Sequence, residues 1–257
     1  MFCEAPADFR LASGLIDRVL RTSGPTWVAD NFATPEVIRT WHPGSSGRMY
    51  FDVHALDKVA EPLRVRSRGH FNGQPGRAGA AMARKAFLIA NALYRKTPGE
   101  PIDAVVVVWD VDHQQEGRQL GVLEDARNDA RRWAPFKILC GFPDPESEAW
   151  VLAGFEPRDD DERKCLAELH RELGFSPVLD AVRLRDKNKG ALRDIERVLS
   201  VLTGDDHDRL ALCWTEPALE TLRARGAETG LSAFLDEIET LLVPLLDPGG
   251  SAVRSSR

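Results

Sequence analysis

The chain lacks the features that would place it in a secreted, membrane or zinc-binding class. Its four cysteines, Cys3, Cys140, Cys165 and Cys213, include no pair with the close spacing of a zinc or redox motif. No secretory signal precedes them, so we expect reduced thiols in a cytoplasmic protein. No apolar run approaches the roughly 20 residues that cross a bilayer, and no membrane segment is predicted.

A basic net charge is also absent. The formal net charge is −6 at pH 7, which gives no overall attraction to nucleic acid. Any binding to phosphate must therefore use a local group of Lys and Arg side chains. The composition, 43% hydrophobic and 29% charged residues, is that of a soluble globular protein.

The most informative stretch is an apolar run that ends in two acids. Ala104–Val108 is too short for an ordinary helix and mostly β-branched, which predicts a strand buried on both faces of a parallel sheet. Asp110 and Asp112 follow it, and alternation along a strand points both carboxylates the same way at its carboxyl end. Such a pair favours Mg²⁺ or Mn²⁺, because both are hard cations that prefer oxygen ligands. The alternative is that both acids only cap the next helix.

Further acids follow two other predicted elements. A very short apolar segment at the start of the chain ends in Glu4, and Asp8 lies on the helix that comes next. A predicted strand over residues 136–140 leads into a helix whose first turns contain Glu146 and Glu148. The helix dipole favours an acid there regardless of function.

These motifs together resemble a known fold. In order and spacing, Cys3-Glu4-Ala5-Pro6-Ala7-Asp8, the strand into Asp110 and Asp112, and Pro145-Glu146-Ser147-Glu148-Ala149-Trp150 are similar to the Toprim fold of topoisomerases, bacterial primases and OLD-type nucleases. In detail they resemble stand-alone Toprim-like proteins often associated with bacterial defence. The resemblance covers roughly residues 1–155.

The resemblance implies a fold and an activity. The expected fold is α/β, with a Toprim-like, mainly parallel sheet over residues 1–155 and a helical region over 156–257 packed on it. The expected activity is Mg²⁺- or Mn²⁺-dependent cleavage of DNA or RNA. The resemblance also allows a role in phage defence and a partner protein that is encoded nearby. The catalytic and metal-binding residues are then Glu4, Asp110, Asp112 and Glu148.

The resemblance selects Glu148 over Glu146 because Glu148 stands two residues before Trp150. Neighbours two apart on a helix differ by about 200° in direction, so only one of the two readily faces a metal. We expect Glu148 to face Asp110, and Glu146 to face solvent or a basic side chain such as Lys137.

Two alternatives remain open at this point. Only three residues precede Glu4, and Ala5 stands where Toprim proteins usually carry Gly. Both departures favour a degenerate Toprim module that binds a partner or regulates it. A haloacid-dehalogenase-type phosphatase also uses Asp-x-Asp after an apolar strand, but Gln114 here occupies the place of its usual Thr.

A basic, glycine-rich segment over residues 62–85 is the predicted nucleic-acid contact. Its proposed phosphate-binding residues are Arg68, His70, Arg77 and Lys85, and it opens a helix predicted over residues 78–94. It is not a P-loop, because Gly-Lys-Ser/Thr is absent. The alternative is a solvated surface loop.

The remaining predictions concern local structure. Residues 26–29 are a candidate second strand, and residues 116–133 are expected to form one amphipathic helix. From residue 156 onward the pattern predicts helices over 159–173, 189–202, 206–213, 217–224 and 232–246. The basic stretch 183–189 is either a nucleic-acid contact or a hydrated connector.

Overall fold

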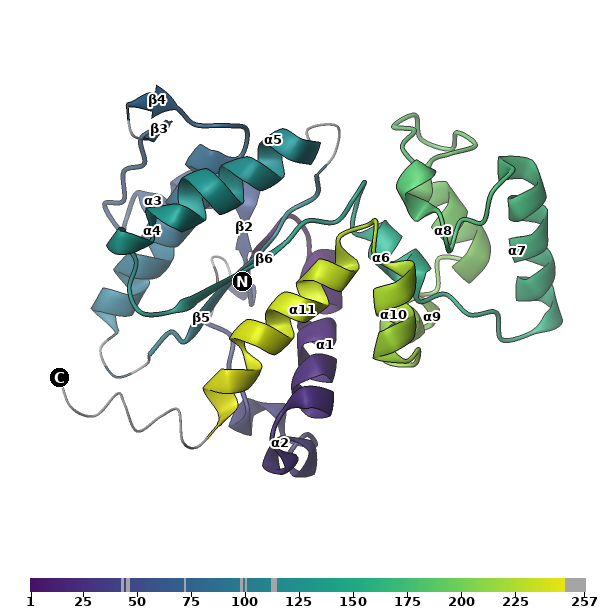
Figure 1. The fold of residues 1–257 in the computed structure, drawn as a ribbon, viewed down its shortest axis with the longest axis horizontal. Helices are drawn as coiled ribbons and strands as arrows, with labels where there is room; N and C mark the ends of the chain where they lie inside the picture. The colour runs from purple at the N-terminus through teal and green to yellow at the C-terminus, as the bar shows by residue number, and fades with distance from the viewer. Residues whose placement is uncertain are drawn as a thin grey trace.

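The computed structural model describes residues 1–42, 44, 47–71, 73–97, 99, 101–111 and 115–247. It is an α/β protein with a four-stranded parallel sheet flanked by helices and with a helical C-terminal region (Figure 1). The predicted α/β class is therefore confirmed. The strand order is β2-β1-β5-β6. The strands are β1 (Phe2–Cys3), β2 (Phe51–Asp52), β5 (Ala104–Val108) and β6 (Lys137–Gly141), and a separate hairpin pairs β3 (His70–Phe71) with β4 (Gln74–Pro75).

Helices precede, connect and follow the strands. Those of the first part are α1 (Pro6–Ser23), α2 (Thr26–Asp30), α3 (Leu56–Ala60), α4 (Ala80–Lys96), α5 (Gln115–Leu120) and α6 (Glu148–Ala153). Those of the C-terminal region are α7 (Asp160–Leu173), α8 (Ile195–Thr203), α9 (His207–Thr215), α10 (Leu219–Arg225) and α11 (Leu231–Leu241). No described helix is long and apolar enough to span a bilayer.

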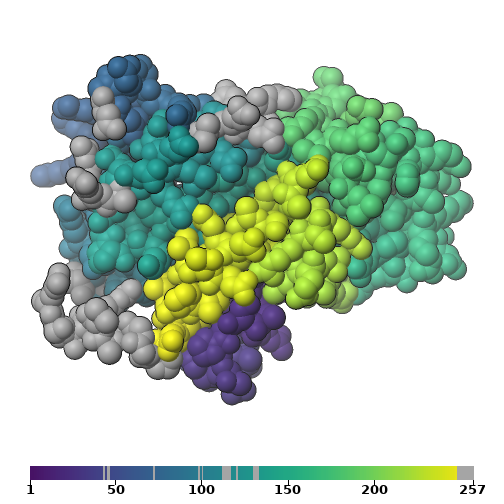
Figure 2. Space-filling model, in the orientation of Figure 1, coloured from purple at the N-terminus to yellow at the C-terminus, as the bar shows by residue number. Residues whose placement is uncertain are grey.

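The sheet is covered on both faces, as the uninterrupted apolar run of β5 predicts. Val106 and Val108 pack with α1 and α11 in one core cluster. Val105 and Val107 pack with α4 in the other. Alternate residues of a strand point to opposite faces, so one short run supplies both cores. Figure 2 shows α11, in yellow, lying across the molecule next to α1, in purple.

The C-terminal helices join the α/β part through α1, α6 and α11. Arg18 of α1 donates hydrogen bonds to the carbonyl oxygens of Trp214 and Pro217. Trp150 of α6 stacks on Phe234 of α11, with ring centroids 4.9 Å apart. Trp150 also donates its indole N–H to the Thr229 carbonyl at 2.7 Å. These contacts fix α6, and with it Glu148, against the sheet.

Two local predictions before residue 156 are wrong. Residues 26–29 form the helix α2 and not a strand, because Pro25 supplies a preset N-terminal turn and Val28 is fully buried. The predicted helix 116–133 is α5 followed by a π-helical turn, Gly121–Ala126, and a 3₁₀ segment, Arg127–Arg132. A Cβ at Gly121 would lie 2.2 Å from the Ala78 carbonyl oxygen, so this close approach requires glycine.

Candidate functional site

Acidic residues stand at the carboxyl end of every strand in the sheet. Asp52 ends β2, Glu4 directly follows β1, Asp110 lies two residues beyond β5, and Asp144 lies three residues beyond β6. Because the four strands are parallel, these positions share one edge of the sheet. The sheet topology thus gathers acids that are far apart in the sequence.

Asp110 is an acid at this edge whose pKa the other acids raise. Burial is the largest cause that raises its pKa, to about 9, and the negative charges of Asp8, Glu148, Glu4 and Glu146 add to the increase. We call these five residues the acidic edge. A carboxyl group among four others is stable only if it binds a proton or a cation.

Glu148 is the second carboxyl with a strongly raised pKa. Its pKa is raised to about 7, mainly by burial. A backbone hydrogen bond lowers the pKa, and the charges of Glu146, Asp8 and Glu196 raise it. Glu148 opens α6, directly after the N-cap residue Ser147. The start of α6 therefore brings this carboxyl toward the end of β5.

Asp8 belongs to the site although the sequence analysis assigned it no role there. Its carboxylate accepts the Ala5 N–H at 2.8 Å and the Ser147 hydroxyl at 2.9 Å. It is 6% exposed. The spacing of four between Glu4 and Asp8 was the available signal, but an acid in the first turn of a helix is common without any function.

Glu4 has a neighbour from the turn that follows β2. His54, on the 3₁₀ turn Val53–Ala55, places its Nε2 atom 3.5 Å from Oε1 of Glu4. The Asp52 carboxylate accepts the His54 N–H at 2.9 Å and so fixes that turn. His54 is exposed and lies beside the acidic edge.

Glu146 and Glu148 differ in their surroundings, as their spacing predicts. Glu148 contributes more than Glu146 to the raised pKa of Asp110. Glu146 forms an ion pair with Lys187 of the C-terminal region, and not with Lys137. The sequence analysis considered a basic partner for Glu146 but named the wrong lysine, because Lys187 is distant in the chain.

Asp112 lies outside the described residues. Within the part of the chain that the structure describes, no three His, Cys, Asp or Glu side chains form a group that could hold a metal ion as they stand. The chemistry of the acidic edge still fits a hard divalent cation, because its donors are all carboxylates and burial disfavours the charged form of Asp110 and Glu148.

Two of the predicted nucleic-acid contacts are engaged with acids. Arg77 forms an ion pair with Glu124 at 2.5 Å and lies 3.6 Å from Asp125. Lys85 forms an ion pair with Asp57 at 2.6 Å. A phosphate would have to compete with these carboxylates for both cations.

The other two, Arg68 and His70, are exposed on the segment that leads into the β3–β4 hairpin. Buried Arg84 organises this segment, because its guanidinium donates to the carbonyl oxygens of Arg68 and His70 at 2.9 and 2.7 Å. It also pairs with Asp129 at 2.9 Å. Arg84 thus supports the backbone while the two side chains face solvent.

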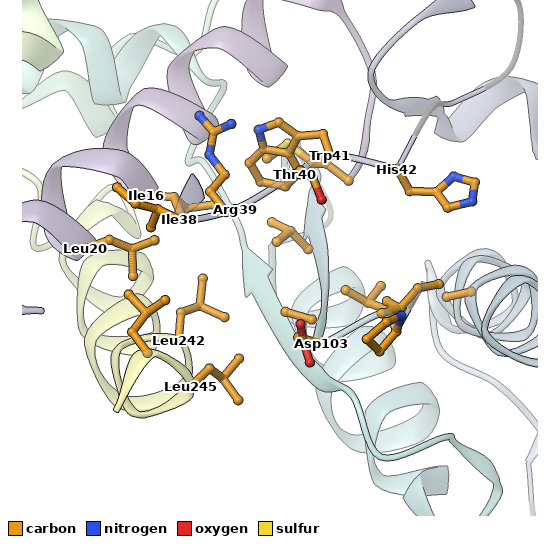
Figure 3. A pocket seen from close by; sticks show the side chains of 18 of the residues that line it. Ile16, Leu20, Ile38, Arg39, Thr40, Trp41, His42, Asp103, Leu242 and Leu245 are labelled. Atoms are coloured by element: carbon orange, nitrogen blue, oxygen red, sulfur yellow. The ribbon is translucent and has the colours of Figure 1, made fainter. Parts of the chain in front are cut away.

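A cavity lies at the other edge of the sheet. It has a volume of about 680 Å³ and is lined near the amino end of β5, by Asp103 and Ala104 among others. Figure 3 shows Leu20, Leu242 and Leu245 along one side of it. No residue of the acidic edge lines it, so the candidate site is the charged edge rather than this cavity.

No protein-family model, no curated protein and no solved structure matches the chain.

The raised pKa values predict how stability depends on pH without metal. The ordinary pKa of Asp110 is 3.8 and its folded value is about 9, so the folded state retains a proton that the unfolded state releases. The contribution of Asp110 to stability is therefore full below pH 3.8 and is lost as the pH rises toward 9. Glu148 acts in the same direction between 4.5 and about 7.

We expect the melting temperature of the metal-free protein to fall across this range, and to fall less in Asp110→Asn. Thermal denaturation in EDTA at several pH values measures both proteins. Parallel curves for wild type and Asp110→Asn would show that Asp110 is ordinarily ionised in the folded state.

Proposed function

We propose that this chain is a metal-dependent nuclease of Toprim type that cleaves DNA or RNA in the bacterial cytoplasm, with phage defence as its setting. The observation that carries the proposal is the acidic edge. Carboxylates that follow two parallel strands, Glu4 and Asp110, share one buried charge environment with Glu148. Such an arrangement is costly for a fold unless it serves a cation.

Each acid has a separate part in the proposal. Glu4, Asp110 and Asp112 would hold Mg²⁺ or Mn²⁺, and Glu148 would serve a second metal or orient the attacking water. Bound there, the cation would lower the pKa of water and neutralise charge that develops on the phosphate. Asp8, which accepts hydrogen bonds from Ala5 and Ser147, would be a further ligand candidate.

Basic side chains would contact a phosphate substrate. Arg68 and His70 are exposed on the basic segment, as the proposed contacts require. Lys187 reaches the acidic edge through its ion pair with Glu146. A nucleic acid would bring phosphates into this mixed environment, where the metal and the basic groups offset their charge.

The test is cleavage by the purified protein. Labelled single- and double-stranded DNA and RNA are incubated with Mg²⁺, Mn²⁺ or EDTA, and the products are separated by size. We expect cleavage that requires the divalent cation. Absence of cleavage of all substrates, with and without a co-purified partner protein, would favour the alternative of a degenerate, partner-binding module.

Glu148 and Glu146 form a matched pair for the second test. Glu148→Gln keeps the shape of the side chain but removes its charge, and we expect metal-dependent cleavage to fall by about 10-fold or more. Glu146→Gln should change cleavage by less than about 3-fold, because Glu146 faces Lys187. Initial rates at saturating metal measure both. The opposite order of effects would exchange the two roles, and two unchanged rates would exclude both residues.

A further inference from the structure

The connection between the 3₁₀ turn Ala181–Arg183 and α8 has a high positive charge. Residues 183–193, which we call the basic loop, contain five basic residues and one acidic residue, in a chain of net charge −6. Figure 1 shows this loop in green next to α8, at the top of the helical region. The sequence analysis left open whether its first part contacts nucleic acid or only connects two elements.

The basic loop has a defined conformation although, after Arg183, it contains no helix or strand. The Asp186 N–H donates to the Arg193 carbonyl at 3.1 Å, which closes the loop. The Asp194 carboxylate accepts the N–H groups of Gly190 and Glu196 at 2.6 and 3.0 Å. Asp186 and Asp194 thus bind backbone groups, and the loop needs no ligand to keep its shape.

Two of its cations attach the loop to the carboxyl edge of the sheet. Arg185 places Nη2 2.6 Å from Oδ1 of Asp144, whose side chain is 4% exposed. Lys187 pairs with Glu146 of the acidic edge. These contacts hold the loop next to the proposed catalytic carboxylates.

The other three cations, Arg183, Lys189 and Arg193, face solvent and have no acidic partner among the described residues. The guanidinium carbons of Arg183 and Arg193 lie 4.0 and 5.7 Å from the centre of the Phe175 ring. Two like charges are thus held at one buried aromatic side chain, and their repulsion favours an anion bound between or beside them. The surface suits a ligand that carries several negative charges.

We propose that the basic loop binds the phosphodiester backbone of a nucleic-acid strand whose adjoining phosphate lies at the acidic edge. This inference rests on the proposed function, because it extends the substrate from the metal site onto the helical region. A strand offers phosphates at regular intervals, so it contacts both places at once, and its affinity comes mainly from such charge contacts. Backbone contacts of this kind do not depend on base sequence.

Binding in EDTA tests the loop separately from cleavage. Fluorescence anisotropy with short labelled single strands of DNA and of RNA is measured over a salt series for wild type and for Arg183→Gln/Lys189→Gln/Arg193→Gln. We expect this triple variant to bind both strands about 10-fold more weakly at low salt. The slope of log K against log salt should fall by about 2, because single strands lose roughly 0.7 per contact removed.

A variant of equal charge change is the control. Arg163→Gln/Lys164→Gln/Arg171→Gln alters three exposed basic residues of α7 in the same helical region. We expect it to bind nearly as wild type. Circular dichroism melts verify that both variants fold.

Each outcome is decisive. Equal weakening of binding in the two triple variants would mean that only net charge matters, and would overturn the proposal. Wild-type affinity in the loop variant, or no binding by the wild-type protein, would also overturn it. Loss of binding in the loop variant of a protein that cleaves nothing would sink the nuclease function and retain the loop as a nucleic-acid surface. If the wild-type protein cleaves nucleic acid and the loop variant binds it as wild type does, the nuclease function is retained and the loop is excluded as a nucleic-acid surface.

Discussion

Asp110→Asn is expected to slow cleavage by about 100-fold and to make the metal-free protein more stable at neutral pH. The change removes one proposed metal ligand, and a loss of roughly 3 kcal/mol of transition-state stabilisation corresponds to about 100-fold in rate. It also removes a buried group whose pKa is raised to about 9 by burial and by four neighbouring acids. Asparagine needs no proton when the chain folds, whereas Asp110 must take one up at neutral pH, so the variant avoids that cost.

The two measurements are the initial rate of cleavage with Mg²⁺ and the melting temperature in EDTA near pH 8. Asp103→Asn is the matched control for the rate, because Asp103 precedes β5 and thus lies at the opposite edge of the sheet. It should cleave as wild type does. If Asp110→Asn cleaves at the wild-type rate, the acidic edge is not the catalytic site, whatever its effect on the melting temperature.

Arg185→Met is expected to cost about 3–5 kcal/mol of the free energy of unfolding. Arg185 lies 2.6 Å from the Asp144 carboxylate, and within the described residues neither oxygen of that carboxylate has a well-aligned hydrogen bond. Burial already raises the pKa of Asp144, and the Arg185 charge opposes the increase. Removing the arginine leaves a buried carboxylate that must either remain ionised without compensation or take up a proton.

Urea denaturation at neutral pH measures the loss. It should be smaller at low pH, because protonation of Asp144 removes the uncompensated charge. Adding Asp144→Asn to Arg185→Met should recover most of it. Lys187→Met is the control, since its partner Glu146 is 21% exposed and a pair of this kind contributes about 0–1 kcal/mol. Equal small losses in the two single variants would mean that Arg185 does not compensate Asp144.

Local pattern was sufficient for the central strands and for most helices. The uninterrupted apolar run of β5 can be buried only in a sheet covered on both faces, and this follows from side-chain alternation alone. The starts of α7 and α9 also follow from local chemistry, since Asp159 and Asp206 cap them with their carboxylates. The helix predicted over residues 189–202 begins later than expected. Asp194 caps α8, which begins at Ile195, and the residues before Asp194 fold back as a loop.

The sequence by itself determined the α/β class and the strand that precedes Asp110. Tertiary structure alone decided that Asp8 enters the same charge environment and that Lys187, not Lys137, pairs with Glu146. It also neutralised Arg77 and Lys85 with acids from other elements. The physical reason is the range of the interactions. Apolar periodicity and capping act within a few residues, whereas charge partners are brought together by packing between elements that lie tens of residues apart in the sequence.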